Sequence, residues 1–294
     1  MVISPAVVII AAHNEERVIG RCLSALADAI VAGVRVVVVC NGCNDATYTL
    51  ASRHAGVEVV DIPIPSKTLA LREGDRYADE LQSAGLLEPD ASRIYLDADV
   101  VMTSRAITDI VCALDRGPEL ATRPPVRHDT TRATFIVRRW YRVRAQISSF
   151  DHVLWGAGCY ALSAHGRRRF DEFPEVVSDD LFIDMLFGPA EKRTTPTDQV
   201  TVTTPRNLKY LLLILQRTYR TEDELAEHVG SASHTAEASK TKRNHLRDLF
   251  IIATRHPFQL VDLVLYVCVI GTARIRAARD DKRRVWERDD SSRN

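Results

Sequence analysis

The chain has 294 residues, of which 46% are hydrophobic and 27% are charged, a composition that is typical of globular proteins and excludes wholesale disorder. Lysine plus arginine equals aspartate plus glutamate at 39 each, so the bulk charge gives no indication of a nucleic-acid partner. The length suffices for one large α/β domain, or for one domain with appendages.

The first third of the chain alternates apolar runs, typical of buried strands, with segments typical of helices. The predicted strands span residues 6–12, 34–39, 57–62 and 93–96. The predicted helices span residues 14–32, 44–56, 66–84 and 103–115. Asn14 is expected to cap the first helix, and Thr103 or Ser104 the last. This alternation predicts an α/β fold with a mostly parallel, Rossmann-like sheet between helices.

The remainder of the chain is less regular. We expect strands over residues 156–163 and 200–204 and a short helix over 179–187. Further helices are expected over residues 207–220, 246–254 and 257–278. These assignments predict a main domain over residues 1–220, a mobile polar segment over 221–245, and a C-terminal helical extension with a charged tail over 246–294.

Polar side chains follow three of the predicted strands. They lie in Ala12-His13-Asn14-Glu15, in Asn41-Gly42-Cys43 and in Asp97-Ala98-Asp99. Ligands of parallel α/β sheets bind outside the carboxyl ends of the strands, so these three segments are the candidate site. Two carboxylates one residue apart can bind a hard cation together with diphosphate oxygens, although a solvated turn would look the same.

The order of three motifs resembles the nucleotide-binding half of family 2 glycosyltransferases. The motifs are His13-Asn14-Glu15-Glu16, Asn41-Gly42-Cys43-Asn44-Asp45-Ala46-Thr47 and Leu96-Asp97-Ala98-Asp99. The resemblance covers about residues 6 to 220 and implies a GT-A fold, with the nucleotide bound by residues 1–102 and the acceptor by residues 103–220. It also implies transfer of a sugar, with inversion, from a nucleotide-diphosphate donor of the UDP, GDP or dTDP type.

One departure from the family pattern concerns the base of the nucleotide. The family commonly has Asp-Asp where this chain has Cys40-Asn41. An asparagine amide can accept a hydrogen bond from the base or donate one, so uracil, guanine and thymine all stay open. Cys40 and Cys43 have the spacing of a redox or half-zinc motif, but no second pair of Cys or His stands at a suitable spacing for zinc.

The resemblance assigns a set of residues to the donor and its metal. Asp99 and Asp97 are implied to hold Mg²⁺ or Mn²⁺. The residues implied to bind the nucleotide sugar are Ala12, Asn14, Glu15, Asn41, Lys67, Asp97, Ala98, Asp99, Gly156, Gly158, Arg217 and Arg220. Simpler interpretations stay open for several of them. Lys67 would suit a solvated first turn, the two glycines a bend at a strand end, and the two arginines the C-terminal end of a helix.

Asp179 and Asp180 stand where the family has its catalytic Glu-Asp pair. The resemblance implies that Asp180 is the base that takes the proton of the acceptor hydroxyl. Asp179 would orient the acceptor or tune Asp180, since adjacent like charges raise one pKa. Capping of the predicted helix is the alternative use of both acids.

The acceptor and the location of the protein are less constrained. The acceptor is a saccharide, a lipid or a small metabolite. Scattered cysteines and a start without a secretory signal predict the cytoplasm. An apolar stretch over residues 257–271, followed by the basic stretch 274–284, suits a helix that lies at the inner face of the membrane, a homodimer helix or a core helix.

Two other functions compete with glycosyl transfer. Sugar-phosphate nucleotidyltransferases share this type of sheet, but they carry a glycine-rich basic loop that is missing after Ala12. A non-catalytic, membrane-docking protein could keep the same fold, although it would have no need of Asp97, Asp99 and Asp180. Rossmann dehydrogenases and methyltransferases are disfavoured because no Gly-x-Gly turn follows the first strand.

Overall fold

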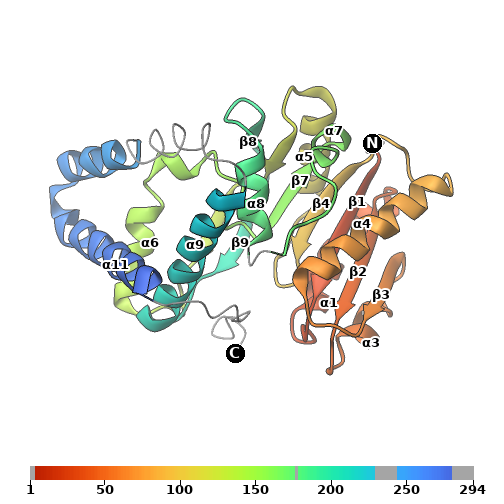
Figure 1. Ribbon diagram of the computed structural model, residues 1–294, viewed down its shortest axis with the longest axis horizontal. Helices are drawn as coiled ribbons and strands as arrows, with labels where there is room; N and C mark the ends of the chain where they lie inside the picture. Colours follow the sequence, from red (N-terminus) through yellow and green to blue (C-terminus); the bar gives the residue numbers. More distant parts are fainter. Residues whose placement is uncertain (1–3, 176–177, 229–243, 280–294) are drawn as a thin grey trace. The chain divides into compact units, whose positions relative to one another are not determined.

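The computed structural model describes residues 4–175, 178–228 and 244–279 (Figure 1). The chain forms two compact units. The first comprises residues 1–127, 154–175 and 186–202, and the second comprises residues 128–153, 176–185 and 203–294. Each unit therefore combines segments that are distant in the sequence.

The first unit is built on a seven-stranded sheet with the strand order β3-β2-β1-β4-β7-β5-β8. The strands are β1 (Ala6–Ala12), β2 (Arg35–Asn41), β3 (Val57–Ile62), β4 (Ser92–Asp97), β5 (Ala121–Arg123), β7 (Cys159–Leu162) and β8 (Lys192–Thr194). Strands β1 to β4 are mutually parallel, and β7 is antiparallel to both β4 and β5. The carboxyl ends of β1, β2 and β4 therefore meet at one edge, as the sequence predicts.

Helices cover both faces of this sheet because β1 and β2 are apolar on both sides. Val8, Ile10 and Ala12 belong to one core with buried residues of α1 (Ile19–Ala25), α2 (Ala27–Val31) and α5 (Ser104–Arg116). Helix α4 (Lys67–Ser83) packs on β1 and β2. Gly74 permits this approach, since a Cβ there would come within 2.3 Å of Ile9 Cγ2. The helix α3 (Thr47–Ala51) packs beside β3, and α7 (Ala164–Arg167) beside β4 and β7.

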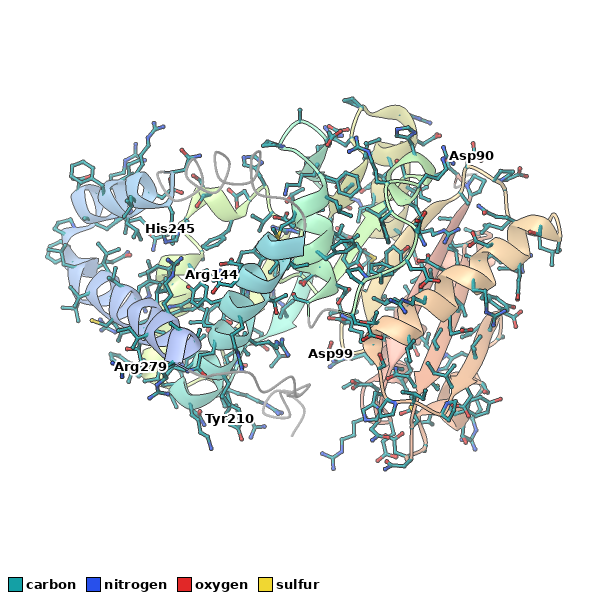
Figure 2. The ribbon with its side chains drawn as sticks, viewed as in Figure 1. Asp90, Asp99, Arg144, Tyr210, His245 and Arg279 are labelled. Carbon is teal, nitrogen blue, oxygen red and sulfur yellow. The ribbon has the colours of Figure 1, made fainter. Side chains whose placement is uncertain are left out.

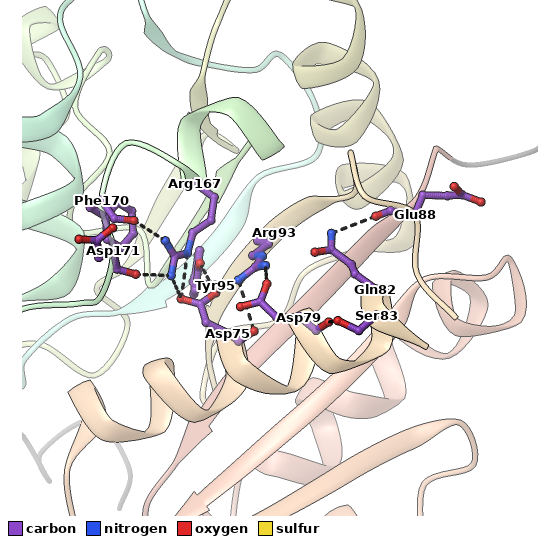
Figure 3. A network of polar contacts seen from close by, with 10 residues as sticks. All are labelled: Asp75, Asp79, Gln82, Ser83, Glu88, Arg93, Tyr95, Arg167, Phe170 and Asp171. Carbon is purple, nitrogen blue, oxygen red and sulfur yellow. Dashed lines mark hydrogen bonds and ion pairs between the residues drawn. The ribbon is translucent and has the colours of Figure 1, made fainter. Parts of the chain in front are cut away.

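A buried polar network ties α4 and α7 to β4 (Figure 3). Asp75 of α4 accepts hydrogen bonds from Arg93 Nη1 at 2.6 Å and from the Tyr95 hydroxyl at 2.7 Å. Arg167 of α7 donates to the other carboxylate oxygen at 3.0 Å. Arg93 also forms an ion pair with Asp79, nearer the surface. Burial, and then the charge of Asp75, raise the pKa of Tyr95 well above its ordinary value, so its hydroxyl stays a donor.

The second unit is mainly helical. Its helices are α6 (Phe135–Arg144), α8 (Asp179–Leu186), α9 (Leu208–His228), a helix over residues 244–255, and α11 (Leu260–Arg279), with the short 3-10 helices η1 (Ser148–Phe150) and η2 (Pro257–Gln259). Strands β6 (Val126–Asp129) and β9 (Val200–Thr203) form a separate two-stranded sheet. The core gathers around Trp140, which stacks on Tyr266 with 5.3 Å between ring centroids.

The structure differs from the sequence prediction at the first helix. Asn14 does not cap it, because Asn14 has a positive φ of 53° and the helix begins only at Ile19. The predicted single helix over 14–32 is also divided into α1 and α2 at Leu26. Asn14 instead forms a turn between the β1 end and the next loop.

The polar segment predicted to begin at Thr221 starts as helix. Residues 221–228 continue α9, and Thr221 and Leu225 are buried on it. Those two residues extend the buried side of α9 begun by Leu211 and Leu212, which the many charges of this stretch conceal in the sequence. Residues 229–243 of the predicted mobile segment lie outside the described residues, and residues 244 and 245 begin the next helix.

Candidate active site

Two loops at the carboxyl ends of β1 and β2 are held together by reciprocal hydrogen bonds. Asn14 Oδ1 accepts from Asn44 N at 2.8 Å, and Asn14 N donates to Cys43 Sγ at 3.5 Å. Glu16 Oε2 accepts from Ala46 N at 3.1 Å. The side chains of the first motif thus satisfy backbone groups of the second, which explains why both motifs are rich in short polar residues.

A second set of bonds fixes the loop that leads into α3. Thr47 Oγ1 accepts from Glu15 N at 2.7 Å and donates to Asp45 Oδ1 at 2.5 Å. Burial raises the pKa of Asp45, but hydrogen bonds from Thr47 and Glu16 outweigh burial and hold this pKa below its ordinary value. Asp45 is therefore an ionised acceptor at neutral pH that anchors both loops.

Asn41 ends β2 and is only 2% exposed. Its Nδ2 donates to the Ala12 carbonyl at 2.9 Å, and its Oδ1 has no hydrogen-bond partner among the described residues. Its own carbonyl accepts from His13 Nδ1 at 2.6 Å, which fixes the proton of the imidazole on Nδ1. The amide of Asn41 is thus oriented, with one acceptor still available to a ligand.

Cys43 lies in the same loop, and its Sγ is 3.4 Å from the Ala12 carbonyl, to which the thiol form donates. A hydrogen bond from Cys40 lowers the pKa of Cys43 below that of an ordinary thiol, with a further contribution from the Asn14 backbone N–H. The same bond and then burial raise the pKa of Cys40, so Cys40 stays a thiol and donates. No group of three or more metal-ligating side chains occurs in the described parts of the chain.

We expect alkylation of Cys43 by iodoacetamide to reach half its maximal rate at a lower pH than an ordinary cysteine does, because the thiolate is the nucleophile and the Cys40 donor lowers the pKa of Cys43. A free cysteine, with a pKa of about 8.5, would react at a comparable rate only at much higher pH. Mass spectrometry of the alkylated peptide measures the rate at each pH. Cys40→Ala should move the midpoint upward, since it removes the donor. A Cys43 rate that rises only above pH 8 in the unaltered protein would contradict this account.

The Asp97-Ala98-Asp99 segment lies where β4 ends (Asp99 is labelled in Figure 2). Asp97 Oδ1 accepts from Lys67 Nζ at 2.7 Å, so the first turn of α4 and the end of β4 are joined by an ion pair. Ala98 is buried, whereas the side chains of Asp97 and Asp99 are partly exposed. Lys67 is thereby placed beside the acidic pair, and a merely solvated position for it is wrong.

Gly158 packs closely against Asp97 and Val100. Its carbonyl accepts from Asp97 N at 2.8 Å, and its φ is +64°. A Cβ at this position would come within 2.5 Å of Val100 Cγ2 and 3.3 Å of Asp97 Oδ2. Gly156 also has a positive φ, of 76°, and both glycines precede β7, which begins only at Cys159. The predicted strand start at residue 156 is therefore a glycine-rich turn.

The acidic pair suits a hard cation, but it is an incomplete coordination shell. Two carboxylates supply only part of the oxygen ligands that Mg²⁺ or Mn²⁺ needs. The described residues contain no third acid or histidine that completes the group. The remaining ligands would have to come from a bound diphosphate or from water, as is usual for Mg²⁺ held with substrate phosphates.

Asp179 and Asp180 are the first two residues of α8, in the second unit. Asp180 Oδ1 accepts from Leu181 N at 2.8 Å and from Ser178 Oγ at 2.5 Å. Asp179 is buried, and Asp180 is partly exposed. The carboxylate of Asp180 therefore contacts the start of its own helix, which fits the capping interpretation and leaves its proposed chemistry a prediction.

Arg217 and Arg220 lie within α9, eight residues or more before its end at His228. The prediction that they end the helix is wrong, since α9 continues through Thr221 and Leu225. The attraction of cations to a helix C-terminus falls off within the last turn and therefore does not explain them. They are three residues apart and share one side of α9.

The sequence motifs contain His13, Cys43, Asp45 and Thr47, but no role in the site was predicted for them. Cys43, Asp45 and Thr47 shape the two loops, and His13 fixes Asn41. An Asp followed two residues later by Thr is a recognisable local turn motif, so the role of that pair could have been predicted. The hydrogen bonds between the two loops, which are about 30 residues apart in the sequence, could not have been predicted, because they depend on the register of β1 against β2.

Comparison with known proteins gives a family and a set of similar folds. The sequence profile described as Glycosyl transferase family 2 matches residues 7–170. No curated protein matches the chain. The solved structure of the mannosyltransferase PcManGT from Pyrobaculum calidifontis, in complex with GDP-Man and Mn²⁺, is 18% identical with a TM-score of 0.65, over 95% of this chain and 88% of that one.

Two further solved structures have the same fold. Residues 1–349 of TarS from S. aureus are 14% identical with a TM-score of 0.53, over 93% of this chain and 80% of that one. Glucosyl-3-phosphoglycerate synthase from Mycobacterium tuberculosis, in complex with Mn²⁺, UDP and glucosyl-3-phosphoglycerate, is 19% identical with a TM-score of 0.51. The match covers 76% of this chain and 79% of that one. At these identities the similarity establishes the fold, which is GT-A.

Proposed function

Since this chain belongs to glycosyl transferase family 2 and is a glycosyltransferase, we propose that it moves a sugar, with inversion, from a nucleoside-diphosphate donor to an acceptor hydroxyl, with a divalent metal. The observation that carries this proposal is the edge where β1, β2 and β4 end. It joins an oriented amide, two partly exposed carboxylates and a lysine. Family membership removes the nucleotidyltransferase alternative.

The β1 and β2 loops would bind the nucleoside. Asn41 uses its Nδ2 on Ala12, so its available Oδ1 favours a base that offers an N–H, as the rings of uracil, thymine and guanine do. Glu15 and Asn14 flank the same edge. The mannosyltransferase with GDP-Man and the synthase with UDP show that this fold accommodates either base.

The β4 end would hold the diphosphate through the metal. Asp99 and Asp97 are the protein ligands, and Mg²⁺ or Mn²⁺ would supply charge neutralisation for the departing diphosphate. Lys67 pairs with Asp97 at 2.7 Å, so it orients that carboxylate and adds a positive charge beside the phosphates. Gly158 lets the turn before β7 pack closely against Asp97 and Val100, and we propose that this glycine-rich turn lies beneath the transferred sugar.

The second unit would supply the remaining groups. Asp180 acts as the base toward the acceptor hydroxyl and Asp179 orients the acceptor. Arg217 and Arg220 bind the diphosphate that leaves, because a guanidinium can contact phosphate oxygens in a bidentate manner. Their common side on α9 supports a joint role.

A thermal-shift panel of UDP, GDP, dTDP and CDP, each with Mn²⁺, tests the proposed function. We expect at least one of the first three to raise the melting midpoint by several degrees, because a ligand at a hundred times its Kd stabilises by about 2.7 kcal/mol. Asp99→Ala should abolish the Mn²⁺-dependent part of this shift with little loss of stability. Asp90→Ala, which removes an exposed acid of the same unit, should leave the shift unchanged.

Two results would count against the proposal. No shift with any of the four nucleotides would remove the donor site from the β1, β2 and β4 ends. A shift that depends on Mn²⁺ as strongly in Asp99→Ala as in the unaltered protein would remove Asp99 from the metal site. Calorimetric titration of Mn²⁺ into the unaltered protein and into Asp99→Ala, each with the nucleotide that gives the largest shift, measures the contribution of Asp99 to metal binding directly.

A further inference from the structure

One face of η2 and α11 exposes an unusual amount of apolar surface. Phe258 is 98% exposed, and Val261 and Val264 are 68% and 62% exposed. With Leu260, Val267 and Ile275, which are also exposed, these six residues are called here the apolar face. At 100° per residue its α11 members fall within about 120° of the helix circumference. A contiguous exposed apolar stripe of this kind marks an interaction site.

The opposite side of α11 is used for packing inside the second unit. Tyr266, Val269 and Ala273 are buried in the core that also holds Trp140 of α6. Asp262 is 1% exposed, and its two carboxylate oxygens accept from Arg139 at 2.5 Å and from Arg142 at 3.2 Å. The helix is therefore apolar on both sides, and only one of them is accounted for by the core.

The charges around the apolar face are distributed at its two ends. From Phe258 to Ala273 the sequence has a single charged residue, the buried Asp262. Arg255 and His256 precede this stretch, and Arg274, Arg276 and Arg279 follow it, all of them exposed. Arg279 is labelled at the end of α11 in Figure 2. An uncharged, apolar centre between cationic ends matches the acyl and headgroup layers of an anionic bilayer.

We propose that the apolar face docks the second unit onto the surface of an anionic lipid bilayer, with α11 lying along that surface. Pro257–Arg279 is the one helix of the described residues that is long and apolar enough to cross a membrane. Crossing would require Asp262 to leave its two arginines and Tyr266 to leave Trp140, which would place an uncompensated carboxylate in hydrocarbon. Docking along the surface buries the apolar face and keeps those contacts.

A second copy of the chain fits the same face less well. In a two-fold symmetric contact along α11, each end of the helix meets an end of its copy. Both ends are cationic, with Arg255 at one and Arg276 and Arg279 at the other. Either helix direction therefore brings like charges together, whereas anionic headgroups neutralise them.

Co-sedimentation of the full chain with vesicles tests the docking. Vesicles of phosphatidylcholine alone are compared with vesicles that contain one-third phosphatidylglycerol, at low and at high salt. We expect partition onto the anionic vesicles to exceed that onto neutral ones at least about tenfold and to fall at high salt, because screening removes the contribution of the arginines. Equal partition onto both vesicles, or none onto either, would overturn the proposal.

Substitutions test the apolar face and the basic residues at its ends separately. The double variant Phe258→Glu and Val264→Glu should lower partition at least about tenfold, since two exposed apolar side chains are replaced by anions. Arg255→Glu should lower it at least about fivefold on anionic vesicles only, because one basic residue contributes about 1 kcal/mol and the new acid is repelled. Val31→Glu is the matched control, because Val31 is 88% exposed but belongs to the first unit, and it should bind like the unaltered protein.

The outcomes are separable from those of the nucleotide panel, since the proposal does not depend on glycosyl transfer. Each variant is checked by circular dichroism and by its melting midpoint, and the exposed positions should leave both unchanged. If the double variant keeps full partition, the apolar face does not dock. If sedimentation velocity instead shows a dimer that the double variant dissociates, and vesicles are not bound, the face belongs to a second copy and the proposal is wrong.

Discussion

Asp75→Ala is expected to lower the free energy of unfolding by about 3–5 kcal/mol, the usual cost of removing one partner from a buried ion pair. The Asp75 side chain is 4% exposed, and its carboxylate is shared by Arg93, Arg167 and Tyr95. Without it, the buried guanidinium of Arg93 and the half-buried guanidinium of Arg167 lose their common counter-charge. Denaturation by urea, followed by circular dichroism, measures the change.

Asp79→Ala is the matched control for this experiment. Asp79 pairs with the same Arg93, but its side chain is 60% exposed. An exposed ion pair contributes only about 0–1 kcal/mol, so the control should unfold close to the unaltered protein. If both variants lose the same stability, burial of the network is not what makes Asp75 important. Destabilising α4 through Asp75→Ala would also affect the candidate site, because the same helix carries Lys67 in its first turn and Asp75 two turns later.

The nucleotide-binding half was largely predictable from the sequence. Strands β1 and β3 have the predicted bounds of residues 6–12 and 57–62, since runs of valine and isoleucine between polar segments favour one arrangement, a strand in a parallel sheet. The predicted cap at Thr103 is also confirmed, because its side chain accepts from Ala106 N. The apolar runs and the helix cap can be recognised from neighbouring residues alone, so predicting them does not require the rest of the chain.

Other elements could not be predicted because their signals are not local. Helix α6 has the sequence Phe-Ile-Val-Arg-Arg-Trp-Tyr-Arg-Val-Arg, in which arginines interrupt the apolar periodicity. It forms because Val137, Trp140 and Val143 are buried and because Arg139 and Arg142 pair with Asp262, about 120 residues later. Strands β5 and β8 have three residues each, too few for an alternating pattern to be recognised.

Part of the candidate site stays a prediction even with the structure. Lys67, Asp97 and Gly158 belong to the first unit, and Asp97 contacts both of the others directly. Asp180 and Arg217 belong to the second unit, and their assignment rests on the family pattern. The role of Asp180 is therefore the assignment that most needs an experiment.

Asp180→Asn is expected to lower the rate of glycosyl transfer at least about a hundredfold, the scale on which a positioned general base contributes. Asparagine keeps the Oδ1 that accepts from Leu181 N and Ser178 Oγ, so the start of α8 should be preserved, but it cannot take a proton. Nucleotide binding should also persist, because Asp180 is not among the proposed donor ligands. Single-turnover release of the nucleoside diphosphate, with the donor selected by the thermal-shift panel, measures the rate.

Asp179→Asn is the matched control, since it changes the adjacent acid and should cost less than the loss of the base. If these acids only cap α8, the two variants should lose about 1 kcal/mol of stability or less and keep their transfer rate. A melting curve beside each rate measurement distinguishes the two interpretations. An Asp180→Asn protein that melts early and yet releases the nucleoside diphosphate at the normal rate would remove Asp180 from the mechanism and leave it a helix cap.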